Sequence, residues 1–153
     1  MDLSAHPRPT PRGDSFLAGR HHVIVADRFF PYDFDLRFAF AWRSFGVKPS
    51  TDGVTVSKAK VVATYGRFRV ETPLSNVECA SETGPYQWWR AVGLRGSLVD
   101  SGITFGTTPR GGVCILFKKR IPQVAFTAKA HAGLTVTVAD REGLIAALLS
   151  TKG

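Results

Sequence analysis

Few side chains in this sequence have the types and spacing that catalysis requires. Cys114 and His131 could act as nucleophile and base, but Cys114 lies in the apolar run 112–117, where a buried structural thiol is the commoner meaning. Asp33 and Asp35 could form a carboxylate pair, yet both fall on the solvent side of the strand that we expect there. The sequence therefore predicts a protein that is not an enzyme.

Motifs for metal ions and nucleotide cofactors do not occur in the sequence either. Its two cysteines and four histidines form no CxxC or HExxH pattern. His21 and His22 are adjacent, and adjacent residues of a strand point to opposite faces. The glycine-rich segments 102–106 and 110–112 match neither a P-loop nor a dinucleotide-binding fingerprint and are typical of hairpin turns. We expect no metal site and no cofactor.

Basic side chains are better candidates for a binding site. The formal net charge is +8, and the whole excess lies between residues 43 and 130. Arg67 and Arg69 lie two residues apart on one expected strand, and Lys58 and Lys60 lie on or next to the preceding one, so each pair projects from one face. A hairpin turning at Gly66 would gather the four cations into a patch that could bind phosphates.

Two further groups could extend this patch. The basic run at 118–120 ends an expected strand, where it would widen the patch or protect a sheet edge against aggregation. The aromatic segment at 86–90 could anchor at a membrane interface, stack on nucleic-acid bases, or cap the end of a barrel. The candidate anion-binding residues are Lys58, Lys60, Arg67, Arg69, Lys118, Lys119 and Arg120, and the candidate interfacial residues are Tyr86, Trp88, Trp89 and Arg90.

A single domain of short strands must position these residues. The length of 153 residues fits one domain. Residues 1–20 are rich in proline and glycine and predict a flexible tail, which leaves 21–153 for the domain. Strict alternation over Phe34–Arg43 predicts a central core strand. The residues that this alternation would bury are Phe34, Leu36, Phe38, Phe40 and Trp42.

Shorter strands and one helix make up the rest of the expected domain. Asp140 is a good N-cap for a helix over 140–149, which Gly143 should weaken by about 1 kcal/mol relative to alanine. We expect a mostly β fold, a small antiparallel β-barrel or orthogonal sandwich with this one C-terminal α-helix. The expected strands are 22–26, 54–57, 60–65, 67–72, 76–82, 95–99, 103–107, 113–118 and 134–138, and the further core residues are Phe68, Val70, Val136, Val138, Leu144 and Leu148.

Five motifs follow one another between residues 50 and 150. They are the Asp52-Gly53-Val54 turn, the hairpin at 65–70, the corner at 73–77, the tryptophan segment at 88–95 and the strand-to-helix ending at 134–144. This order resembles that of the bacterial pleckstrin-homology-like domains. The core of that family has seven strands, fewer than the candidates here, so the strand order stays open. The resemblance implies a module for binding or assembly, often at membranes, without chemistry of its own.

The expected partner is an anionic membrane surface or an acidic protein. Nucleic acid is the alternative for the same cations, and a small-ligand-binding barrel or an enzyme is a further one. Self-association stays open. No apolar run resembles a signal peptide or reaches the length of a membrane-spanning helix, and the two cysteines are expected to be reduced. We therefore expect a cytoplasmic protein that acts peripherally at the inner membrane face.

Overall fold

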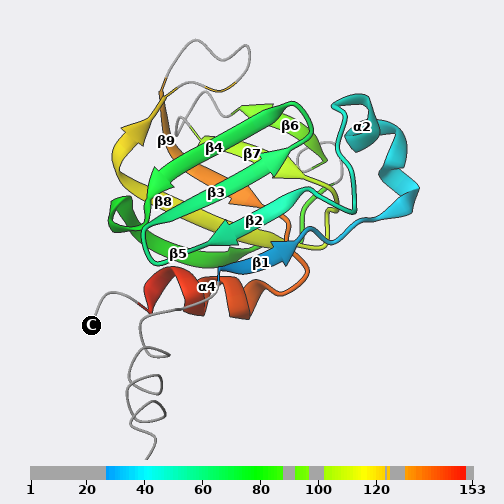
Figure 1. Cartoon of the computed structure of the whole chain (residues 1–153). Coiled ribbons are helices and arrows are strands. Elements are labelled where there is room, and N and C mark those ends of the chain that lie inside the picture. Colours follow the sequence, from blue (N-terminus) through cyan, green and yellow to red (C-terminus); the bar gives the residue numbers. More distant parts are fainter. Residues whose placement is uncertain (1–26, 88–91, 97–101, 123, 125–129, 151–153) are drawn as a thin grey trace, which may run out of the picture.

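Two β-sheets pack face to face in the computed structural model, and a C-terminal helix lies along one side of them (Figure 1). The structure describes residues 27–87, 92–96, 102–122, 124 and 130–150. The two sheets meet at one corner, where Tyr32 bridges Val138 and the Ala139 N–H donates to the Pro31 carbonyl at 3.0 Å. The expected mostly β fold with one C-terminal helix is confirmed in the form of this sandwich, whose sheets are not closed into a barrel.

The first sheet has the strand order β1-β2-β3-β4, and all its neighbours are antiparallel. Apolar side chains alternate along these strands, so that one face of the sheet packs on the core. Gly66, with a φ of +61°, turns the chain from β3 into β4, as the sequence predicts. The strands are β1 (Arg28–Pro31), β2 (Gly53–Val56), β3 (Lys60–Tyr65) and β4 (Phe68–Pro73).

The second sheet has the order β5-β8-β9-β7-β6. Its strands are β5 (Val77–Thr83), β6 (Gly93–Gly96), β7 (Gly102–Gly106), β8 (Gly112–Ile121) and β9 (His131–Val136), and a short 3₁₀ helix, η2 (Leu74–Asn76), joins the two sheets. The expectation of a wholly antiparallel fold is wrong at one pair, because β7 and β9 run parallel. β9 follows β8 in the sequence and lies between β8 and β7 in the sheet. It pairs antiparallel with β8 on one side and parallel with β7 on the other.

The core fills the space between the sheets and extends under the C-terminal helix, α4 (Arg141–Leu149). Leu144 and Leu148 of α4 are fully buried, as expected. Asp140 caps the helix by accepting a hydrogen bond from the Gly143 N–H at 3.0 Å. The expected core residues Val70, Val136 and Val138 are buried as well, whereas Phe68 is only half-buried.

The predicted core strand over Phe34–Arg43 is wrong. The segment forms a 3₁₀ turn, η1 (Leu36–Phe38), that continues into a short helix, α2 (Ala39–Ser44). Trp42 is completely buried, but Leu36 and Phe40 are 72% and 65% exposed. In a helix, residues four apart share a face, so the alternating apolar residues separate into an inward and an outward set, and the expected burial of Leu36 and Phe40 is wrong too.

Several predictions fall outside the described residues. The proposed tail at 1–20, the strand at 22–26, part of the strand at 95–99, and Trp88, Trp89 and Arg90 belong to this group.

Candidate anion-binding surfaces

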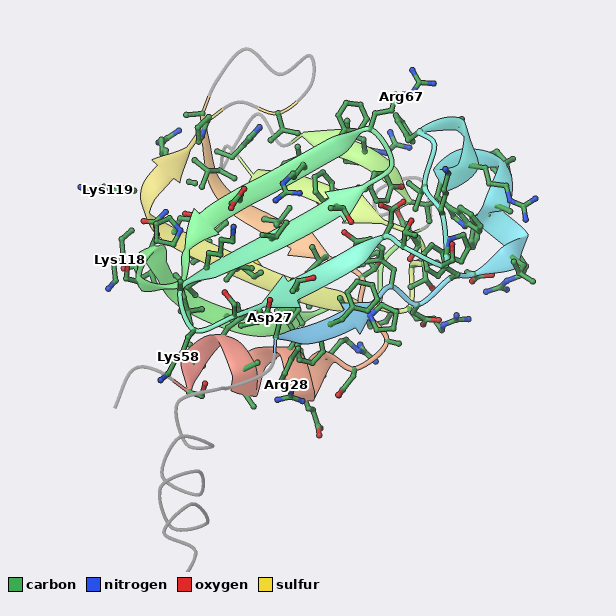
Figure 2. The ribbon with its side chains drawn as sticks, in the orientation of Figure 1. Asp27, Arg28, Lys58, Arg67, Lys118 and Lys119 are labelled. Carbon is green, nitrogen blue, oxygen red and sulfur yellow. The ribbon has the colours of Figure 1, made fainter. Side chains whose placement is uncertain are left out.

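The hairpin of β3 and β4 does not gather its four candidate cations into one basic patch. Arg67 lies in the β3–β4 turn and Lys58 in the β2–β3 turn, at opposite ends of the hairpin (Figure 2). Lys60 and Arg69 lie between them, and both bind Glu71: Lys60 Nζ is 2.6 Å from Oε1 and Arg69 Nη2 is 3.2 Å from Oε2. Their hydrogen bonds, first that of Lys60, hold the pKa of Glu71 below its usual range.

A groove of about 270 Å³ crosses the outer face of this sheet. Lys60 and Arg69 line it together with Asp27 and several Thr and Ser hydroxyls. Since Glu71 lies beside these two cations, the face carries two positive and two negative side chains. The groove is therefore balanced in charge and offers no excess of cations to an anion.

The run at 118–120 lies near the end of β8, and Figure 2 shows its Lys118 and Lys119 on the same side of the sandwich as Lys58. Asn76 of η2 holds the run in place, because its Nδ2 donates to the Lys119 carbonyl at 2.9 Å and its Oδ1 accepts from the Lys119 N–H at 2.8 Å. At the other end of η2, the Leu74 N–H donates to the Ala59 carbonyl at 2.9 Å, next to Lys58. We call Lys58, Lys118, Lys119 and Arg120 the basic edge.

A β-bulge explains why three consecutive cations of β8 all face solvent. Along β8 the pairing to β9 passes from Leu116, opposite Gly133, directly to Ile121, opposite His131. The residues of β8 between these two points are out of register with β9, so the alternation of a regular strand is lost. Lys118, Lys119 and Arg120 are all exposed. Within the described part of the chain, no cation of the basic edge forms an ion pair with a carboxylate.

Asp35 organises the opposite end of the molecule. Its carboxylate accepts the Arg37 N–H at 3.1 Å and pairs with Arg37 Nη2 at 2.8 Å. The side-chain hydrogen bond of Arg37 is the main reason that the pKa of Asp35 lies below its usual value. The Asp35 carbonyl also accepts a bond from Trp42 Nε1 at 3.2 Å. Asp35 is thus buried, at 3% exposure, and the expectation that it faces solvent is wrong.

Arg67 belongs to this end rather than to the basic edge. Its N–H donates to the Phe45 carbonyl, just after α2, at 3.4 Å. Gly66 packs so closely on the same residue that an added Cβ would overlap the Phe45 carbonyl oxygen. We call Leu36, Arg37, Phe40, Arg43 and Arg67 the α2 end. All five are exposed.

Sequence reasoning identified only Arg67 at the α2 end. It missed Leu36, Phe40 and Arg43, which follow one another at positions i, i+4 and i+7 and would share one face of a helix. This helical spacing is present in the sequence, but the apolar residues of the same segment also alternate as in a strand, and the alternation favours the wrong prediction. The last described candidate, Tyr86, is half-buried, and its N–H donates to the Pro109 carbonyl at 2.7 Å. Burial raises its pKa.

No protein-family model, no curated protein and no solved structure matches this chain. Among the residues that the structure describes, no helix has the length and apolar character to cross a bilayer. In the same residues, no three His, Cys, Asp or Glu side chains come together in a way that could hold a metal ion. Cys79 is exposed and Cys114 half-buried, and neither forms a disulfide bond.

Proposed function

We propose that this chain is a non-catalytic binding module that docks on anionic phospholipid surfaces. The proposal rests on where the cations without an ion-pair partner lie among the described residues. The basic edge provides such cations at one end of the sandwich, and Arg43 and Arg67 provide them at the other. The sheet face between the two ends is balanced in charge. Each cation close to an anionic membrane contributes about 1 kcal/mol of attraction.

The shape of these surfaces favours lipid headgroups over a nucleic-acid strand. The cations of the basic edge lie on a bulge and a turn, and Arg67 lies on a turn, so they project from convex parts of the molecule. A strand of nucleic acid is usually held along a basic groove, whereas the groove on the first sheet has no net positive charge. A flat array of headgroups can reach convex cations without any groove.

The fold that we propose is of the pleckstrin-homology-like type. Its support is the order of motifs in the sequence, together with a sandwich of two sheets that α4 flanks. The parallel pairing of β7 with β9 departs from a purely antiparallel arrangement. A fold of this type is a frame for binding surfaces and implies no reaction.

Sedimentation of the full chain with lipid vesicles tests this function. We expect binding to vesicles of phosphatidylcholine with phosphatidylserine, none to phosphatidylcholine alone, and weaker binding as salt rises. The double variants Arg43→Glu/Arg67→Glu and Lys118→Glu/Lys119→Glu carry the same change in charge at opposite ends. The variant that alters the docking end should bind about 30-fold more weakly or worse. No binding of the wild type at low salt would refute the proposal, and a shift of labelled DNA or RNA without vesicle binding would favour nucleic acid.

A further inference from the structure

The α2 end carries the two most exposed large apolar side chains of the described residues. Leu36 is 72% and Phe40 65% exposed, compared with 47% for Phe29 and 41% for Leu116 on the outer faces of the sheets. Single apolar side chains on a surface need no explanation. Two of this size, four residues apart on one short helical segment, place a concentrated apolar surface in water.

The helical segment formed by η1 and α2 has one exposed side and one buried side. η1 continues directly into α2, so Leu36, Phe40 and Arg43 fall on its outward side. On the inward side, the Trp42 ring is completely buried and lies 5.1 Å from the ring of Phe34. The guanidinium of Arg43 lies 5.3 Å from the centre of the Trp42 ring, which links the outward cation to the buried anchor.

The base of the segment is held firmly. Asp35 caps η1 and bonds to Arg37, and Arg110 reaches across from the turn before β8 to bind Asp33 at 2.7 Å and Asp35 at 3.4 Å. The exposed side chains therefore stand on a backbone that is already ordered. Docking would cost little further loss of backbone freedom.

We propose that the α2 end is a membrane anchor that inserts Leu36 and Phe40 into the boundary between headgroups and acyl chains of an anionic bilayer. This inference rests on the proposed function and assigns its docking face. Charge complementarity selects the bilayer as the occupant. Arg37 and Arg43 lie on the same helical segment as the apolar pair, and Arg67 lies in the turn that contacts Phe45 just after α2. Arg43 and Arg67 form no ion pair in the described part of the chain. A short amphipathic helix with cations beside its apolar side chains is suited to this boundary.

Apolar insertion and charge attraction respond differently to salt. Attraction between exposed charges is screened as the ionic strength rises, whereas the burial of apolar side chains is not weakened by salt. The anchor therefore predicts a part of the vesicle binding that persists at high salt and depends on Leu36 and Phe40. The basic edge, at the other side of the sandwich, should not contribute to that part.

The test compares the full-length wild type with Leu36→Ser/Phe40→Ser on vesicles containing phosphatidylserine, at about 0.1 M and about 0.5 M salt. Phe29→Ser/Leu116→Ser is the matched control, because it removes two exposed apolar side chains away from the α2 end. We expect the α2 variant to keep its low-salt binding in part and to bind at least about tenfold more weakly than wild type at high salt. The control should bind like wild type.

Insertion into a lipid monolayer gives a second measurement. Wild type should raise the surface pressure of a phosphatidylserine monolayer, and both Leu36→Ser/Phe40→Ser and the single variant Leu36→Asp should not. If wild type binds vesicles but the α2 variants match it in both measurements, the anchor is refuted while the proposed function stands. Equal losses in the control would also refute the anchor. If wild type binds no anionic vesicle, the function and the anchor are refuted together.

Discussion

Arg110 donates two hydrogen bonds to the Asp33 carboxylate, from Nη2 to Oδ1 at 2.7 Å and from Nε to Oδ2 at 2.9 Å. The third nitrogen, Nη1, lies 3.4 Å from Asp35 Oδ2. This two-pronged geometry is typical of a guanidinium on a carboxylate. The turn before β8 is thereby tied to the chain segment that enters η1, so the position of the α2 end depends on a residue far away in the sequence.

Removal of this contact should loosen the α2 end. We expect Arg110→Ala to lower the free energy of unfolding by about 1 kcal/mol, a modest amount because the Arg110 side chain is half exposed to solvent. Arg110→Lys should recover only part of the loss, since an ammonium group cannot bind both carboxylate oxygens at once in the same way. Urea unfolding measures the difference. Equal stability of all three proteins would contradict this role.

The hydrogen bonds from Arg37 make the contribution of the Asp35 carboxylate to stability depend on pH. Its pKa is lower in the folded chain than the value of about 3.9 in an unfolded one. The folded state therefore binds fewer protons, so the stabilisation is complete above that value and is lost as the pH falls through the folded pKa. Asp35→Asn should be less stable than wild type by about 1 kcal/mol or more near pH 7. The difference should shrink below about pH 4.

Stability measured by urea unfolding between about pH 2 and pH 7 checks this prediction. A difference between Asp35→Asn and wild type that stays constant over the whole range would contradict it. Glu71, which is exposed and bound by Lys60 and Arg69, provides the control position, because screening by solvent should leave Glu71→Gln close to wild type.

Gly143 plays a different part from the one that helix propensity predicts. A Cβ added there would lie 2.6 Å from Asp140 Cγ, within the cap of α4. Gly143→Ala should therefore not stabilise the protein, and Asp140→Ala should cost about 1 kcal/mol. In the Asp140→Ala background, however, Gly143→Ala should raise the unfolding free energy by about 1 kcal/mol, because only propensity then remains. Additive effects in this double-mutant cycle would show that cap and glycine are independent.

The strands of the hairpin could be predicted because local signals agree there. The range 60–65 coincides with β3, and the glycine at 66 has the positive φ that a tight turn requires. The register that follows from this turn places Glu71 opposite Val62, one step diagonally from Lys60. The hairpin register therefore predicts that Glu71 lies beside Lys60 and neutralises part of the expected basic patch.

The segment 34–43 could not be predicted in the same way, because its apolar residues fit two periods at once. Alternate positions along a strand also contain pairs that are four apart on a helix, such as Phe38 and Trp42. One contact of the folded segment also reaches far along the chain. The carboxylate of Asp35 meets Arg110, 75 residues later in the chain, and a contact of that separation leaves no local signal. The exposed pair Leu36 and Phe40 was missed because the strand-like alternation covers the same residues.

The contact between the β3–β4 turn and α2 makes Gly66 a sensitive position. Its φ is +61°, and a Cβ there would overlap the Phe45 carbonyl oxygen. Gly66→Ala should therefore destabilise the protein by more than about 1 kcal/mol and weaken the contact of Arg67 with Phe45, just after α2. Gly133, whose Cβ would meet its nearest neighbours at 3.1 Å, allows a milder comparison. Thermal unfolding that is unchanged in Gly66→Ala would contradict this packing.

The most direct test of membrane docking is hydrogen–deuterium exchange of the full chain with and without vesicles that contain phosphatidylserine. The α2 end should lose contact with water when the chain binds. We predict slower exchange of the amides at 36–46 and 66–68 on the vesicles, and unchanged exchange at 116–121 in the basic edge. Slower exchange at 116–121 with no change at 36–46 would contradict the account, because the opposite end of the sandwich would then face the lipid.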